Sequence, residues 1–382
     1  MADTLGCWNI ADLRRKARAR LPLGVWEYLE RGVEDESGMA RNREAFDRLT
    51  FRPRVLRKVD RVDTCTTLLG SESALPLAIA PTGAAGMMWH RGDLALAKAA
   101  AKAGVPFCIS SASMMDVEAF ARIDGIRWFQ LYMWENRELS FDVVRRAQAI
   151  GCEALFVTLD LPVPPNREYL WRNGFGMPFQ LNGRNLADIL AHPRWLASVI
   201  GRYMLEGGLP RQANLPEELR QSVVRGAKPG ALFKQDDLVW EDIARLRELW
   251  PGKLVLKGVL HPGDASQAVE MGADGVVVSN HGARSLDHSV AAIDALPSVV
   301  EAVGGRISVL LDSGIRRGSD VVKALALGAD GAMVGRATLY GLAAAGEAGV
   351  TRALDLLGAE ISRTMAMLGL ASVEVIDSDA LG

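Results

Sequence analysis

A histidine and an arginine lie three residues apart in the segment Ser279-Asn280-His281-Gly282-Ala283-Arg284. The segment follows the apolar run 275–278, which is typical of a buried parallel strand. The His281 imidazole can accept a proton near neutral pH, and the Arg284 guanidinium can bind a carboxylate through two hydrogen bonds. This pair predicts chemistry on a small anion, with a purely structural histidine as the alternative.

The elements that must position these residues are short apolar runs that alternate with helix-like segments from residue 75 onward. The runs cover 75–81, 106–110, 128–132, 154–160, 254–258, 275–280, 309–312 and 332–335. The intervening segments 93–103 and 319–327 have helical apolar spacing and stop at Gly104 and Gly328. Eight such units predict an α/β fold, a (β/α)8 TIM barrel, which typically spans about 250 residues. An open doubly wound sheet is the weaker alternative, because no GxGxxG turn is present.

Polar and reactive residues gather where these runs end. They are Thr82, Ser110, Gln130, Tyr132, Thr158, Asp160, Lys257, Asn280, His281, Asp312, Gly335 and Arg336. The carboxyl ends of barrel strands meet at one mouth, where the active sites of such barrels lie. The pattern therefore predicts an active site at that mouth.

Two glycine-rich turns after the last two runs predict a phosphate site. The first is Asp312-Ser313-Gly314-Ile315-Arg316-Arg317-Gly318, and the second is Gly335-Arg336. Backbone N–H groups and a helix dipole at such a turn bind phosphate, and an arginine stands beside each turn. Glycines that serve only tight turns are the alternative.

Composition bounds the class of protein. The 382 residues are 49% hydrophobic and carry a formal net charge of -2, which gives no reason to expect a nucleic-acid partner. The four cysteines have no CxxC spacing, so we expect free thiols and no metal site. No uncharged apolar stretch approaches about 18 residues, the length that a membrane-spanning helix needs. We expect a protein that is cytoplasmic or attached peripherally to the inner face of the cell membrane.

Three motifs, SNHGAR, LDSGIRRG and WFQLY, together resemble the FMN-dependent 2-hydroxy-acid dehydrogenase and oxidase family. The resemblance extends from the early segments 27–29 and 34–36 to Arg336. It implies FMN as cofactor, a small 2-hydroxy acid as substrate, a homotetramer, and oxidation of an (S)-2-hydroxy acid to the 2-keto acid. A barrel isomerase acting on a phosphorylated substrate and a non-catalytic flavin-binding protein are the rival functions.

The resemblance also implies catalytic roles. His281 is expected to be the base, with Asp312 as the carboxylate that orients it. Tyr132 is expected to bind the substrate hydroxyl oxygen, and Lys257 to lie near the N1 and O2 atoms of the flavin. Proton removal from carbon and hydride transfer both remain open as mechanisms.

Binding roles follow in the same way. Arg167, Arg284 and Tyr28 are expected to bind the substrate carboxylate. The residues expected to hold FMN, beside Lys257 and Asp312, are Ala80, Pro81, Thr82, Ser110, Gln130, Thr158, Ser279, Gly314, Arg316, Gly335 and Arg336.

Two small residues bear on the subtype. Ala112 leaves room for a larger substrate side chain, as in the mandelate and lactate enzymes of the family. A glycine at position 83 is similar to the dehydrogenases of the family, which pass electrons to a membrane quinone. Many oxidases of the family carry alanine at this position. We therefore predict a mandelate-like or L-lactate dehydrogenase that uses a quinone or another acceptor. A soluble oxidase that uses O2 and releases H2O2 is the alternative.

Two further regions flank the predicted barrel of residues 75–382. Residues 1–74 are expected to form a helical N-terminal extension, with helix starts near Asn9 and Leu23. An insertion at about 162–235 follows the fourth strand and is far longer than an ordinary loop. Its part from Arg167 to Lys234 has ten Lys or Arg residues against five Asp or Glu. One helical face there is apolar, with Trp195, Leu196, Val199, Ile200, Tyr203 and Met204. A basic amphipathic helix favours attachment to a membrane surface; a cover for the active site or a subunit contact is the alternative.

Overall fold

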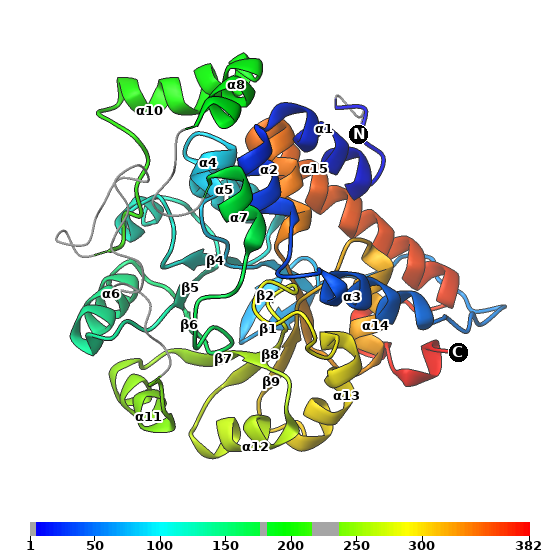
Figure 1. The fold of residues 1–382 in the computed structure, drawn as a ribbon. Helices are drawn as coiled ribbons and strands as arrows, with labels where there is room; N and C mark the ends of the chain where they lie inside the picture. The colour runs from blue at the N-terminus through cyan, green and yellow to red at the C-terminus, as the bar shows by residue number, and fades with distance from the viewer. Residues whose placement is uncertain (1–4, 176–181, 216–236) are drawn as a thin grey trace.

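The computed structural model describes residues 5–175, 182–215 and 237–382. Eight parallel strands close into a barrel in the order β10-β3-β4-β5-β6-β7-β8-β9 (Figure 1). The strands are β3 (Leu77–Ile79), β4 (Phe107–Ser110), β5 (Arg127–Leu131), β6 (Ala154–Thr158), β7 (Lys253–Val259), β8 (Gly275–Val278), β9 (Ser308–Leu311) and β10 (Gly331–Val334). Each overlaps one predicted apolar run, so the predicted (β/α)8 barrel is confirmed.

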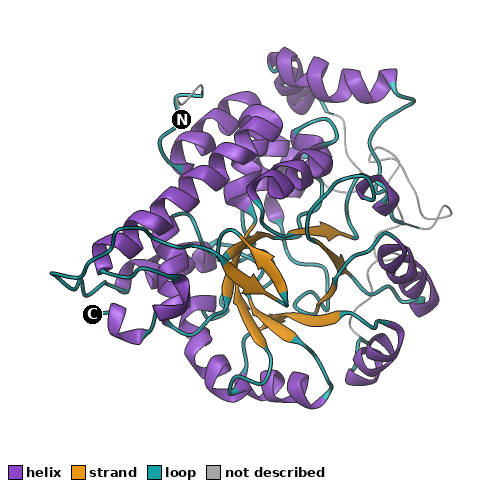
Figure 2. Cartoon of the chain, turned by 180° about the vertical axis from the view of Figure 1, so that it is seen from behind, coloured by secondary structure: helices purple, strands orange, loops and turns teal. Residues whose placement is uncertain are grey.

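Helices surround the ring of strands (Figure 2). Those after the barrel strands are α4 (Ala85–Met88), α5 (Gly92–Ala103), α6 (Arg137–Ala149), α11 (Trp240–Leu249), α12 (Pro262–Glu270), α13 (Ala292–Val303), α14 (Gly318–Ala326) and α15 (Arg336–Leu368). The predicted stop at Gly104 is the C-cap of α5, with a φ of 66°. The unit after β4 departs from the pattern, because it has the short 3₁₀ helix η1 (Val117–Phe120) in place of an α-helix. Two more short helices, η4 (Val373–Val375) and η5 (Ser378–Ala380), end the chain.

The barrel interior and the layer between strands and helices form two apolar cores. Inside the barrel, the rings of Trp128 and Phe156 stack with centroids 5.1 Å apart. Leu68 and Leu69, from the hairpin β1 (Thr66–Leu68) and β2 (Ser71–Ser73), belong to the same interior cluster. The carboxyl ends of the strands thus rest on a packed interior and can carry a site.

Three helices precede the barrel: α1 (Ile10–Arg20), α2 (Leu23–Glu30) and α3 (Ser37–Arg48). The predicted helix starts near Asn9 and Leu23 are confirmed, and the Asn9 side chain accepts a hydrogen bond from the Asp12 N–H at 2.8 Å. Helix α1 packs along α15, and α3 packs against α13. The amide of Asn42 in α3 exchanges two hydrogen bonds with Asn280, which connects this region to the SNHGAR loop.

The described part of the insertion contains α7 (Glu168–Asn173), α8 (Gly183–Ala191), α9 (Pro193–Trp195), the π-helix η2 (Leu196–Gly201) and α10 (Arg202–Leu205). Figure 1 shows α8 and α10 beyond the rim of the barrel. Residues 176–181 and 216–236 of the predicted insertion lie outside the described residues.

Half of the apolar face predicted for a membrane is covered by protein, and Met204 of that face is exposed. Trp195, Val199 and Tyr203 are buried. The Trp195 indole donates to the Met87 carbonyl at 2.8 Å, and the Tyr203 hydroxyl accepts from the Arg91 N–H at 3.1 Å. Spacing alone identifies an apolar face but not the surface that covers it. Across the described residues, no helix combines the length and hydrophobicity that crossing a bilayer requires.

Candidate active site

A cavity of about 440 Å³ opens at the carboxyl ends of the strands. Seventeen predicted site residues line it: Tyr28, Ala80, Pro81, Thr82, Gly83, Ala112, Tyr132, Thr158, Arg167, Lys257, His281, Arg284, Asp312, Gly314, Arg316, Gly335 and Arg336. The other three, Ser110, Gln130 and Ser279, are buried and hydrogen-bonded to residues of the cavity wall. The structure therefore brings the predicted set together at one mouth of the barrel.

A chain of hydrogen bonds joins the ends of β4, β5 and β6. The Ser110 hydroxyl donates to Gln130 Oε1 at 3.0 Å, and Gln130 Nε2 donates to Thr158 Oγ1 at 2.9 Å. Ser110 Oγ also accepts the Ala112 N–H at 3.1 Å. These bonds fix the wall on which Ala112 and Thr158 are presented.

The backbone around His281 is strained. His281, Gly282 and Ala283 have φ values of 57°, 63° and 58°, which residues with a Cβ rarely adopt. Hydrogen bonds hold this turn: Ser279 Oγ accepts the His281 N–H at 3.0 Å, and Ser313 Oγ accepts the Gly282 N–H at 2.9 Å. Such strain concentrates at functional sites, which favours the chemical role of His281 over the structural one.

The carboxylate that holds the imidazole is Asp160. Its Oδ1 lies 2.9 Å from His281 Nδ1, so this nitrogen donates and Nε2 is left to accept a proton. Nε2 lies 3.4 Å from the Tyr132 hydroxyl. The assignment of Asp312 to this position is wrong, because Asp312 Oδ2 pairs with Lys257 Nζ at 2.8 Å.

Room for Asp160 comes from Gly258. The β7–β8 register shifts between Lys257 and Val259, and Gly258 has a φ of 104°. A Cβ at Gly258 would lie 2.7 Å from the Asp160 side chain. Sequence analysis placed Asp160 at a strand end but offered no sign of this bulge, and so missed its partner.

Burial and charge set the protonation of this cluster. Burial opposes ionisation of Asp160, yet the His281 charge and hydrogen bond hold its pKa below the ordinary value. Burial, followed by the Asp160 charge, raises the pKa of Tyr132 to about 12, so its hydroxyl keeps its proton. Burial disfavours the charged Lys257, but the carboxylates of Asp312 and Asp160 raise its pKa to about 12.

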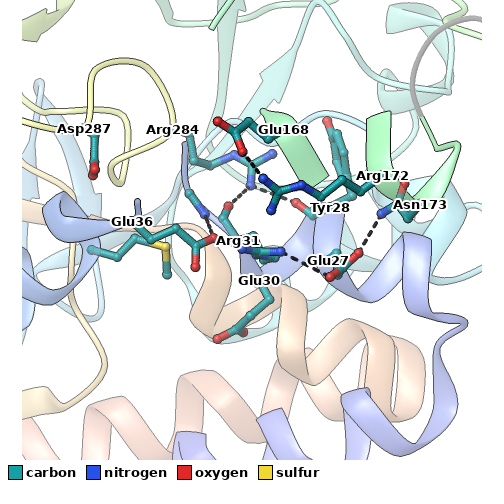
Figure 3. A network of polar contacts seen from close by, with 12 residues as sticks. Glu27, Tyr28, Glu30, Arg31, Glu36, Glu168, Arg172, Asn173, Arg284 and Asp287 are labelled. Atoms are coloured by element: carbon teal, nitrogen blue, oxygen red, sulfur yellow. Dashed lines mark hydrogen bonds and ion pairs between the residues drawn. The ribbon is translucent and has the colours of Figure 1, made fainter. Parts of the chain in front are cut away.

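Arg167, Arg284 and Tyr28 converge on one side of the cavity. Arg284 Cζ lies 5.1 Å from the centroid of the Tyr28 ring, and Arg167 Nη2 donates to the Arg284 carbonyl at 3.2 Å. Figure 3 shows Arg284 beside Tyr28, with its guanidinium turned toward the end of α2. Burial and the Arg284 charge lower the pKa of Arg167. Two guanidinium groups and a phenol that face one space suit a carboxylate.

The two turns predicted to bind phosphate differ in the structure. Gly335 and Arg336 line the cavity where α15 begins. The N-terminus of α14, in contrast, is capped by protein carboxylates. Asp320 Oδ2 accepts the Arg316 and Arg317 N–H groups, and Glu360 accepts that of Gly318. The groups that the first turn offers to a phosphate are therefore Gly314 and the Arg316 side chain, and not the N-terminus of α14.

The charge of this region suits a phosphate group. Burial, together with the charges of Arg284 and Arg316, lowers the pKa of Arg336 to about 9. Clustered buried cations are stabilised by a bound anion. The residues present thus fit the phosphate of FMN, and the barrel mouth offers both apolar and hydrogen-bonding side chains to its ring.

Five apolar residues that the sequence analysis missed also line the cavity. They are Met88, Leu161, Val163, Leu170 and Phe175. Most come from the start of the insertion, where irregular backbone gives no periodic signal. A Cβ on Gly83 would lie 3.3 Å from Ala112 Cβ and 3.5 Å from the Tyr28 hydroxyl, so this corner of the cavity is narrow.

Comparisons with known proteins agree with this geometry. The model of the FMN-dependent dehydrogenase family matches residues 17–382. (S)-mandelate dehydrogenase of Pseudomonas putida is 42% identical over 375 residues, 98% of this chain and 93% of that protein. L-lactate dehydrogenase of Alcaligenes faecalis is 39% identical over 373 residues, 97% of each chain. The crystal structure of the monotopic membrane protein (S)-mandelate dehydrogenase superposes with a TM-score of 0.91 at 40% identity, covering 99% of both chains.

The match covers His281 and the two arginines of the predicted phosphate site, Arg316 and Arg336. It confirms the predicted family and cofactor. The chain belongs to the FMN-dependent dehydrogenases, and FMN is its cofactor.

Proposed function

We propose that this protein oxidises an (S)-2-hydroxy acid with an apolar side chain to the 2-keto acid. The observation that carries the proposal is the His281–Asp160 pair, at 2.9 Å, in the same cavity as Arg167, Arg284 and Tyr28. A proton acceptor and a carboxylate site together match the two functional groups of a 2-hydroxy acid.

The chain's residues have distinct roles in this proposal. FMN held by the residues of the cavity would supply the two-electron acceptor for the substrate. His281 Nε2 accepts a proton, from the α-carbon or from the hydroxyl, and Asp160 stabilises the imidazolium that results. Tyr132 donates a hydrogen bond to the hydroxyl oxygen. Lys257 supplies a positive charge to the reduced cofactor.

Cavity shape supports a medium or aromatic side chain on the substrate. Gly83 and Ala112 add little side-chain volume to the narrow corner beside Tyr28, and the apolar residues Met88, Leu161 and Phe175 line the same cavity. We therefore place mandelate first and L-lactate second, and the similarity to the P. putida mandelate dehydrogenase supports this order.

The test is anaerobic mixing of the FMN-loaded protein with (S)-mandelate, L-lactate and glycolate. Loss of the oxidised flavin absorbance should be fastest with (S)-mandelate and slowest with glycolate. Absence of bleaching with every acid would contradict the function, and a preference for glycolate would contradict the assigned substrate class.

The proposed electron acceptor is a membrane quinone, with oxygen as the rival. Gly83 favours the quinone through its resemblance to the dehydrogenases. Reduction of a quinone analogue without air, with little peroxide under air, is the expected result. Stoichiometric peroxide under air would assign an oxidase. A homotetramer is proposed from the same resemblance, and light scattering after gel filtration checks it.

Peripheral membrane attachment is proposed through exposed apolar side chains of α8 and α10 rather than through the buried face. Leu186, Leu190, Met204 and Leu205 have exposed fractions of 43%, 61%, 58% and 89%. Arg184 lies on α8, Arg194 on α9 and Arg202 on α10, and their charges favour an anionic surface. The monotopic membrane character of the structural relative supports this attachment.

Sedimentation with vesicles of anionic and neutral lipid tests the attachment. Wild-type protein should bind the anionic vesicles, and the pair of substitutions Leu190→Ser and Leu205→Ser should weaken binding. Equal binding by the variant would place the contact elsewhere.

A further inference from the structure

Helix α2 of the N-terminal extension and α7 of the insertion lie side by side and antiparallel. Figure 3 shows the middle of this contact, where Glu27 Oε2 accepts a hydrogen bond from Asn173 Nδ2 at 2.7 Å. One turn earlier in α2, a Cβ on Gly24 would overlap the Phe175 ring, so only glycine allows this approach. Residues nearer the C-terminus of α2 therefore contact residues nearer the N-terminus of α7.

The contact continues at the other end of α2. Arg31 Cζ lies 5.4 Å from the centroid of the Tyr169 ring, and the Glu34 N–H donates to the Asn166 carbonyl at 3.2 Å. Arg31 is itself held by Glu27 Oε1 at 3.4 Å and by Glu36 Oε1 at 2.8 Å. Gly24 and Glu27 lie about one helical turn apart on α2, and Arg31 and Glu34 follow the C-terminal end of that helix. The contact therefore extends from one face of α2 into the segment that follows it.

Arg167 depends on this contact for its position. It is the N-cap residue of α7, and its buried Nε has no hydrogen-bond partner among the described residues. A hydrogen bond from Nη2 to the Arg284 carbonyl is its polar contact within the site. The placement of its guanidinium therefore follows the placement of α7.

Helix α2 also holds Tyr28 and Arg284, the other two residues proposed to bind the substrate carboxylate. Tyr28 belongs to α2, and Arg284 Nη1 donates to the carbonyls of Tyr28 and Arg31 at 2.8 and 2.7 Å. Helix α2 is thus common to all three residues that face the substrate carboxylate.

We propose that Glu27 is a positioning residue for substrate recognition: by binding Asn173 and Arg31 it fixes α7 on α2 and so sets Arg167 at the distance from Arg284 that a carboxylate requires. This inference rests on the proposed function, because it takes the substrate carboxylate to bind at Arg167 and Arg284. Glu27 itself does not line the cavity.

The test compares (S)-mandelate with mandelamide, which has the same shape without the carboxylate charge. Glu27→Ala and Asn173→Ala should each lower the acid-to-amide ratio of kcat/KM by about tenfold, mainly through KM of the acid, since small displacements of a binding group are costly. Glu27→Gln keeps an oxygen for Asn173 and should fall between wild type and Glu27→Ala. The double variant should lose no more than either single variant, because both substitutions break the same contact.

Binding without turnover provides a second readout. Phenylacetate, titrated against the FMN-loaded protein by calorimetry, should bind about tenfold more weakly to Glu27→Ala, and phenylacetamide should bind equally to both proteins. Arg172→Gln is the matched control, because Arg172 lies on α7 next to Asn173 but pairs with Glu168 at the exposed face. It should leave the acid-to-amide ratio unchanged.

The outcomes separate the two proposals. If wild type oxidises neither the acid nor the amide, the proposed function fails. If wild type uses the amide as well as the acid, the carboxylate is not recognised at Arg167 and Arg284, and the positioning role is overturned while the oxidation stands. If wild type prefers the acid and Glu27→Ala keeps that preference, the positioning role is overturned and the function stands. An equal loss for acid and amide, or a fall in FMN content, would mark a general structural role and would also overturn it.

Discussion

At the scale of single residues, the site depends on which carboxylate reaches His281. Asp160 and Asp312 both follow strand ends, yet Asp160 contacts the imidazole and Asp312 contacts Lys257. A buried pair keeps both partners oriented, and loss of one partner leaves the other charge uncompensated. Each carboxylate thus holds one side chain of the active site, Asp160 the imidazole of His281 and Asp312 the ammonium group of Lys257.

Asp160→Asn should reduce kcat by about 10²-fold or more, because an amide cannot stabilise the imidazolium that His281 becomes. Affinity for FMN should change little, since Asp160 does not line the cavity. Stopped-flow flavin reduction and fluorescence titration with FMN measure the two effects. A larger loss in Asp312→Asn, with normal flavin binding in that variant, would return the orienting role to Asp312.

The depressed pKa of Asp160 also gives a pH dependence of stability. A carboxyl group whose pKa is lower in the folded state stabilises the fold above its unfolded pKa of about 3.9. That contribution is lost as the pH falls through the folded value. The unfolding free energy of wild type should therefore exceed that of Asp160→Asn at pH 7, and the difference should shrink below about pH 4. Urea unfolding at both pH values checks this, and a difference that grows in acid would contradict it.

The sequence predicted most residues of the site and not all of their pairings. Strand-end positions and the SNHGAR, LDSGIRRG and WFQLY motifs are local, so the cavity lining could be read from them. The Asp160–His281 contact depends on the bulge at Gly258, which arises only when β7 and β8 pair. Pairings between distant strands are tertiary facts that residue types and spacing do not encode.

At the scale of elements, burial explains which predictions succeed. Barrel strands such as β6 and β8 are buried on both faces, so they appear as continuous apolar runs with clear ends. In the insertion, the sequence identified an apolar helical face but not the surface that covers it. The π-helix η2 also interrupts the regular spacing of these helices. The capped N-terminus of α14 was missed because Glu360, one of its partners, lies 42 residues further along the chain.

Helix α15 provides an element-scale test of packing. It has a kink at Ala345 and Gly346, which brings the backbones of Gly341 and Gly349 together. A Cβ on Gly349 would overlap the Gly341 carbonyl. Gly349→Ala should cost about 1–3 kcal/mol of unfolding free energy through overpacking. Gly183→Ala, where a Cβ has open space at the start of α8, is the control and should leave the melting temperature within experimental error. Equal melting temperatures for both variants would contradict the close approach.

At the scale of the whole molecule, the N-terminal extension, the barrel and the insertion meet at one cavity. Tyr28 comes from α2, Arg167 from the insertion, and His281 and Arg336 from the barrel. We expect FMN to bind at this meeting point, and its binding should then stabilise all three regions together.

Removal of FMN should therefore lower the stability of the entire protein. A ligand at about a hundredfold excess over Kd stabilises the folded state by about 2.7 kcal/mol. The apoprotein should melt at a lower temperature, and inorganic phosphate should restore part of the loss by neutralising Arg316 and Arg336. Riboflavin, which has the ring without the phosphate, is the complementary probe. If inorganic phosphate left the melting temperature of the apoprotein unchanged, the proposed phosphate site at Arg316 and Arg336 would be contradicted.

The most direct test of the account is anaerobic flavin reduction by (S)-mandelate in His281→Ala. The account predicts a yellow, FMN-loaded variant whose flavin is not bleached on the time scale of wild type, because Nε2 is the proton acceptor. Bleaching at a near wild-type rate in that variant would contradict the assignment of His281 as the base.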